Sequence, residues 1–163
     1  MSALTNLRQQ AADLLNEKGI PAVAAFEPEG RKLRTEPVAA VSLAQVACQS
    51  GGFQNYLGRY EEGEDSGELY GRAVELTLAL DIYGPRVSGE DACRGLLDRM
   101  AEVLLTEGVA GLTVQELESG NVEFLGSCGM YRLPVRCLCR AWLTAAVRED
   151  GEFVDIRVKG RTV

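Results

Sequence analysis

The alternation of apolar and polar side chains in two segments, 72–83 and 131–147, most constrains the fold of this chain. The apolar residues that alternate in the first segment are Val74, Leu76, Leu78, Leu80 and Ile82. In the second segment the odd positions are mostly apolar, whereas the even positions include Arg132, Arg136 and Arg140. A period of two is typical of β-strands with one buried face. These segments therefore predict a sheet that is covered on one side and polar on the other.

Two other segments have the periodicity of amphipathic helices. The first follows Ser2, which can cap it, and ends at Gly19. The second runs over 89–105, with Ser88 as the predicted N-cap and Gly108 as the residue that ends it.

The remaining apolar segments predict shorter strands over 22–26, 38–49, 112–117, 122–125 and 153–159. The segment 38–49 is apolar on both faces, which favours a central place in the sheet. Runs of strands separated by single helices are typical of α+β domains. The sequence therefore predicts one α+β domain over residues 1–163, with a mostly antiparallel sheet and two helices packed on one of its faces.

A long loop is predicted over 50–71, a segment rich in glycine, acidic residues and aromatic residues. A loop of that length inside a compact domain is usually functional or disordered. Its aromatic side chains either pack on the domain itself or anchor a contact with a neighbouring subunit. The candidate interface residues of this loop are Phe53, Tyr56, Leu57 and Tyr60. We expect the loop to be mobile in an isolated subunit and to become ordered against a neighbour.

The arginines Arg132, Arg136 and Arg140 share one face of the predicted strand over 131–147 and form a basic stripe. Opposite charges on neighbouring strands commonly pair. Acidic residues are available for such pairs at Glu75, Asp81, Glu116, Glu118 and Glu123. Cross-strand pairing is the simplest interpretation of the stripe, and a subunit interface or a contact with nucleic acid are the alternatives. The three arginines are therefore also candidate interface residues.

The composition argues against most catalytic and metal chemistry. The chain has no histidine, which excludes histidine-based triads and removes the commonest ligand of transition metals. Its five cysteines are odd in number and contain no C-x-x-C pair, so neither a disulfide framework nor a zinc site is expected. We expect buried, reduced thiols, no catalytic residues, no metal and no cofactor.

Charge and hydropathy also limit the partners. A net charge of −7 disfavours nonspecific binding of nucleic acid, whose affinity comes from Lys and Arg. No apolar run is long enough to span a membrane, and the first residues lack the pattern of a secretory signal. A cytoplasmic protein without sequence-specific nucleic-acid binding and without a membrane partner is therefore expected.

Three stretches resemble small proteins of bacteriophage tail modules. They are Gly51–Gly58, Leu80–Pro85 and Tyr131–Arg136, the last leading into Trp142. Together with the order of the predicted elements, they make the chain similar to the phage or prophage tail terminator (tail completion) family. Head–tail connector or neck proteins of similar size are an alternative that these stretches leave open.

The resemblance implies a subunit that closes into a hexameric ring. Such a ring caps the end of the tail tube, stops its growth and offers a surface to the head. It implies tail tube and head–tail connector proteins as partners, assembly in the cytoplasm of the bacterial host and a place in the virion tail. The resemblance supplies no catalytic residues. A small α+β ligand-binding domain or a carboxylate-dependent enzyme is the alternative from a different class.

Overall fold

The computed structural model describes residues 3–24, 35–49, 56–109, 111–148 and 153–159. Its helices are α1 (Ala3–Glu17), α2 (Gly89–Glu107) and the short 3₁₀ helix η3 (Arg86–Ser88). Its strands, in chain order, are β1 (Ala22–Val23), β2 (Val38–Gln49), β3 (Tyr56–Glu62), β4 (Asp65–Pro85), β5 (Thr113–Ser119), β6 (Glu123–Leu125), β7 (Met130–Leu133), β8 (Val135–Arg148) and β9 (Phe153–Lys159). None of the helices in these ranges is long and apolar enough to cross a membrane.

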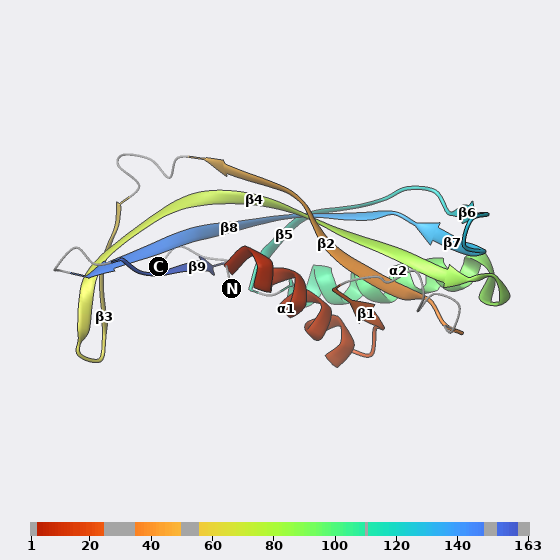
Figure 1. The fold of residues 1–163 in the computed structure, drawn as a ribbon, viewed down its shortest axis with the longest axis horizontal. Helices are drawn as coiled ribbons and strands as arrows, with labels where there is room; N and C mark the ends of the chain where they lie inside the picture. The colour runs from red at the N-terminus through yellow and green to blue at the C-terminus, as the bar shows by residue number, and fades with distance from the viewer. Residues whose placement is uncertain (1–2, 25–34, 50–55, 110, 149–152, 160–163) are drawn as a thin grey trace.

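The strand β4 organises the sheet, because it runs the length of the molecule and has neighbours on both sides (Figure 1). Strands β3 and β2 pair with successive parts of one side of β4, and β8 and β7 pair with the other side. Beyond them, β8 pairs with β5 and β9, and β7 pairs with β6. All of these pairings are antiparallel, and only the two-residue strand β1 is parallel to its neighbour β2. The predicted α+β class and mostly antiparallel sheet are confirmed.

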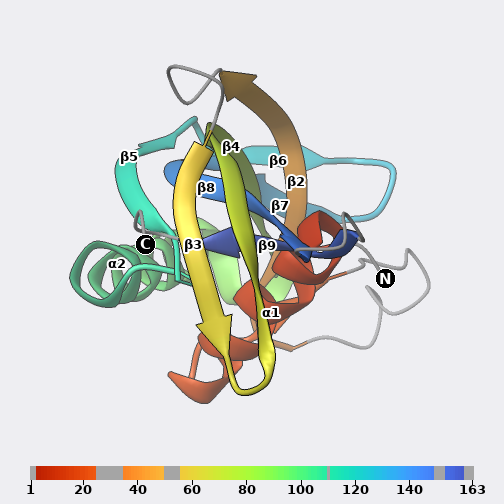
Figure 2. The same ribbon diagram turned by 90° about the vertical axis from the view of Figure 1, so that its left-hand side faces the viewer.

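Both helices lie on the same face of the sheet, as predicted, and enclose the core with it (Figure 2). The alternating apolar residues of β4 that the sequence singled out are at most 1% exposed. The residues that meet them from the other elements include Leu7, Ala11 and Leu15 of α1, Cys93, Leu96, Met100 and Leu104 of α2, and Val135, Cys137, Cys139 and Ala141 of β8. Full burial of one large apolar side chain is worth about 1.5–3 kcal/mol, so this face holds the domain together.

The helix ends agree with the sequence prediction except at the start of α2. Gly19 and Gly108 follow the two helices with φ of 80° and 75°, positive values that glycine adopts without strain. Ser88 does not cap α2, because its own backbone is helical and its hydroxyl donates to the carbonyl of Thr35 at 2.9 Å. The predicted cap Ser2 lies outside the described residues.

The predicted loop over 50–71 is wrong for its second part, which forms a β-hairpin. Strand β3 pairs with the start of β4 from Tyr56 to Glu62. The turn has two residues, Gly63 and Glu64, between the paired residues Glu62 and Asp65. Gly63 has a φ of 64°, and a glycine at the first turn position is typical of tight hairpins. Residues 50–55 lie outside the described ranges, so the expected mobility of the segment stays a prediction.

Two further strand predictions need correction. The segment over 131–147 is divided into β7 and β8 at Pro134, which has no amide hydrogen to donate to a neighbouring strand. The segment 38–49 is a strand, but it is not central beyond its first residues. Strand β1 pairs only with Ala39 and Ala40. No described strand pairs with the rest of that side of β2, where Val46 is 38% exposed.

Candidate assembly surfaces

The three arginines of the predicted stripe lie on the face of the sheet that is turned away from the helices. Two of them pair across strands, as the simplest interpretation predicted. An Nη2 hydrogen of Arg132 is donated to Oδ2 of Asp81 at 3.0 Å, and Nη1 lies 4.0 Å from the Glu123 carboxylate. The hydrogen bond to Asp81 raises the pKa of Arg132, so this guanidinium stays charged at neutral pH. Arg140 lies 3.6 Å from the Glu75 carboxylate, in a more exposed pair.

The third arginine of the stripe, Arg136, is exposed and has no ion-pair partner within 4.0 Å among the described residues. Its neighbour in register is Glu118 on the edge strand β5. Glu118 instead interacts with Glu116, and the hydrogen bond and the like charge raise the pKa of Glu116. Cross-strand pairing is thus confirmed for Arg132 and Arg140 but not for Arg136. The interface role of the three stays a prediction.

The candidate interface residues of the former loop are distributed unevenly. Tyr60 lies on β3, half-buried, and its hydroxyl is buried without a hydrogen-bond partner among the described residues. Tyr56 and Leu57 belong to β3, although the structure does not describe their side chains. Phe53 lies outside the described residues. The turn region exposes the acidic side chains of Glu61 and Glu64.

A second exposed surface, which the sequence analysis did not single out, lies at the other end of β4. Val87 of η3 is 86% exposed and Phe124 of β6 is 50% exposed. The guanidinium carbon of Arg86 lies 5.8 Å from the centroid of the Phe124 ring, within cation–π distance. The ring of Tyr131 contacts the Phe124 ring edge-on, with 5.3 Å between the two centroids. We call Arg86, Val87 and Phe124 the Phe124 patch.

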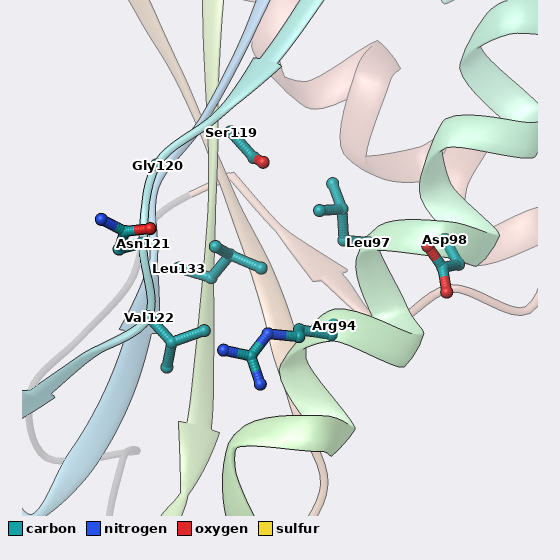
Figure 3. Close-up of a pocket in the computed structure, with 8 residues that line it drawn as sticks. All are labelled: Arg94, Leu97, Asp98, Ser119, Gly120, Asn121, Val122 and Leu133. Carbon is teal, nitrogen blue, oxygen red and sulfur yellow. The ribbon is translucent and has the colours of Figure 1, made fainter.

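A cavity of about 290 Å³ lies between α2 and the connection from β5 to β6 (Figure 3). Arg94 and Leu97 of α2 face Val122 and Leu133 across it, and Asp98 also lines it. This volume is at the lower end of the range for small-ligand sites. The described part of the chain contains no group of three or more potential metal ligands, here or elsewhere. Glu116, the carboxylate with the raised pKa, lies on an exposed strand and outside this cavity.

The cysteines differ from the prediction that all are buried. Cys93, Cys137 and Cys139 are buried in the core, and the last two have their sulfur atoms 3.6 Å apart. The hydrogen bond with Cys137 and the burial raise the pKa of Cys139, and burial raises the pKa of Cys93, so the thiols of Cys93 and Cys139 stay protonated. Cys48, in the part of β2 that pairs only with β4 among the described strands, is exposed, and Cys128 is half-buried.

No protein-family model matches the chain, and no curated protein matches it. Among solved structures, the chain is similar to a chain of the virion of a native gene transfer agent particle. That match covers 85% of this chain and 93% of the other, with a TM-score of 0.38 and 13% sequence identity. Because a TM-score this low does not establish a common fold, we base the functional proposal on the residues of this chain.

Proposed function

We propose that this chain is a structural subunit of a phage tail or phage-tail-like particle, and that it forms a ring that caps the tail tube, stops its growth and provides the surface that joins the head. The observation that carries this proposal is the β3–β4 hairpin. It continues the sheet past helix α1 and ends in a tight, acidic turn (Figure 1). A projecting hairpin with exposed carboxylates is suited to contacting a neighbour.

Two of the three stretches that resemble tail terminators support the proposal through their places in the fold, and most of the third, Gly51–Gly58, lies outside the described residues. Leu80–Pro85 forms the end of β4, where the chain turns into η3 and α2. Tyr131–Arg136 spans the junction of β7 and β8 and carries two of the arginines on the face without helices. A head-to-tail contact between subunits grows into a filament unless it closes, and a ring is the closed form.

The proposal assigns no catalytic activity to the chain. No histidine is present in the sequence, and the described residues bring together no cluster suited to hold a metal. We therefore expect no hydrolase, transferase or redox turnover on a broad substrate panel. Turnover that is lost when one specific carboxylate is neutralised would point to an enzyme instead.

The experiment that tests the proposal mixes the purified protein with tail tubes assembled from the tube protein of the same phage or prophage. Electron microscopy should show rings at tube ends, and tubes should stop elongating once the ring is bound. A protein that never decorates tube ends would refute the terminator role. Binding to isolated heads but not to tubes would identify a connector or neck protein.

A further inference from the structure

We propose that the Phe124 patch (Arg86, Val87 and Phe124) is the docking site for the β3–β4 hairpin turn of a second copy of this chain. The inference rests on the proposed function only in that both require self-assembly. It names the two surfaces that meet, and it predicts a head-to-tail contact between copies.

The patch has the composition of a protein-binding hot spot. Val87 and Phe124 are exposed at 86% and 50%, and exposed apolar groups of this size often mark protein-binding surfaces. The cation–π contact holds the Arg86 side chain over the Phe124 ring and so orders its charge beside an apolar surface. Aromatic residues and arginine are enriched among residues that dominate binding energy.

Charge complementarity indicates the hairpin turn as the occupant. The acids near the patch already have partners, since Glu90 and Asp91 pair with Arg94 at 3.3 and 3.4 Å and Glu123 lies beside Arg132. Arg86 has no ion-pair partner among the described residues.

The hairpin turn offers the opposite charge. Glu61 and Glu64 are exposed and likewise have no ion-pair partner in the part of the chain that the structure describes. Contact between a second copy's turn and the patch would pair these carboxylates with Arg86.

The two surfaces lie at opposite ends of one strand, so one subunit cannot satisfy its own patch. Strand β4 has 21 residues, from Asp65 at the hairpin turn to Pro85 next to Arg86. A strand of that length spans up to roughly 70 Å. Figure 1 shows the hairpin and the β6–β7 end at the two ends of the long axis. Surfaces that are complementary but lie on opposite ends produce a heterologous contact, which closes into a ring or extends as a filament.

The test uses the full chain and measures self-association by sedimentation velocity over a wide concentration range. Arg86→Glu should weaken the association at least about tenfold, because it replaces an attraction with a repulsion. Glu61→Lys combined with Glu64→Lys should weaken it similarly. The chain that carries all three changes should recover association, because the charges are exchanged. Added salt should weaken the wild-type contact.

Matched controls separate the patch from general surface effects. Arg8→Glu changes an exposed arginine of α1 and should leave the association unchanged. Val87→Asp should disrupt assembly, whereas Leu105→Asp, which alters a 64% exposed leucine of α2, should not. Circular dichroism should show a wild-type fold in every variant, because the altered side chains are exposed.

Three results would overturn the inference: a wild-type protein that stays monomeric up to about 1 mM, an Arg86→Glu or Val87→Asp variant that associates normally, or a charge exchange that restores nothing. The proposed function fails in a different way. If copies associate through the patch but never bind tube ends, the docking inference stands and the tail-terminator role is wrong. If rings bind tube ends and the patch variants still form rings, the tail-terminator role stands and the docking inference is wrong.

Discussion

Gly84→Ala should destabilise the fold, because this glycine is where β4 approaches the start of helix α2. A β-carbon at position 84 would lie 2.5 Å from the sulfur of Cys93 and 3.6 Å from Cγ of Pro37. Non-bonded carbon atoms pack best at about 3.5–4.0 Å, so the contact with Pro37 is ordinary and the contact with the sulfur is a clash. The sulfur is fully buried, which leaves it little room to move away.

The magnitude follows from this geometry. Adding a carbon atom to a packed core typically costs about 1–3 kcal/mol, and we expect Gly84→Ala to fall in that range. Cys93→Ala removes the sulfur and should cost about 1 kcal/mol, as expected for deleting one buried heavy atom. In the double variant the nearest remaining contact is the one with Pro37. The alanine at 84 should then cost little, with a coupling free energy of about 1–3 kcal/mol between the two changes.

Urea unfolding followed by circular dichroism and by fluorescence of the single tryptophan, Trp142, measures these quantities. Both probes should report one transition, with the same dependence on urea in all four proteins. If the two single changes add without coupling, or if Gly84→Ala lies within about 0.5 kcal/mol of the wild type, the close approach of β4 and α2 is not as described here. The same junction leads into Arg86 and Val87, so its geometry also sets the position of the Phe124 patch.

Three further predictions concern the thiols, the ion pairs and the acidic pair on β5. In the native protein, the exposed Cys48 should react with a thiol reagent much faster than the buried cysteines. After denaturation, all five cysteines should titrate as free thiols. Fewer than five free thiols, or bound zinc, would contradict the prediction that the cysteines are reduced and free of metal. Arg132→Met should lower the free energy of unfolding by about 1.5–3 kcal/mol, because it removes a half-buried charged hydrogen bond. Arg140→Met removes a more exposed ion pair and should lower it by less than about 1 kcal/mol. Equal losses in urea unfolding would show that burial of the pair does not decide its contribution. The pKa of Glu116 is raised in the folded protein, so ionisation of this carboxyl destabilises the fold at neutral pH and the effect disappears as the pH falls. Glu116→Gln should therefore be more stable than the wild type at pH 7 but not at pH 3. A less stable variant at pH 7 would contradict this.

The sequence predicts the parts of the fold that depend on local periodicity. Alternation identified 72–83 and 131–147 because burial on one face of a strand repeats every two residues. Alternation does not show that apolar residues of 38–49 lie at an edge of the sheet, because the order of strands in a sheet depends on tertiary contacts. The hairpin is not predicted, because glycines and acidic residues at this density are typical of a loop. The turn signal was present, however, in Gly63 between two apolar-containing stretches.

The candidate surfaces likewise include features that the sequence predicts and features that depend on the tertiary structure. The stripe of Arg132, Arg136 and Arg140 was visible in the sequence because all three lie on one strand face. The sequence does not show which of the three arginines form ion pairs, because their distances to the acidic side chains depend on strand register and exposure. The Phe124 patch could not be found from sequence, because Arg86 and Phe124 are far apart along the chain and meet only when η3 packs beside β6.

The mass of the assembled species in solution decides whether the chain forms a ring. Native mass spectrometry, together with sedimentation velocity from low micromolar to about 1 mM protein, would give the number of copies in each species. We expect a concentration-dependent closed assembly, with six copies as the largest discrete species and no open-ended growth. A protein that remains a monomer or a dimer over the whole range would contradict it.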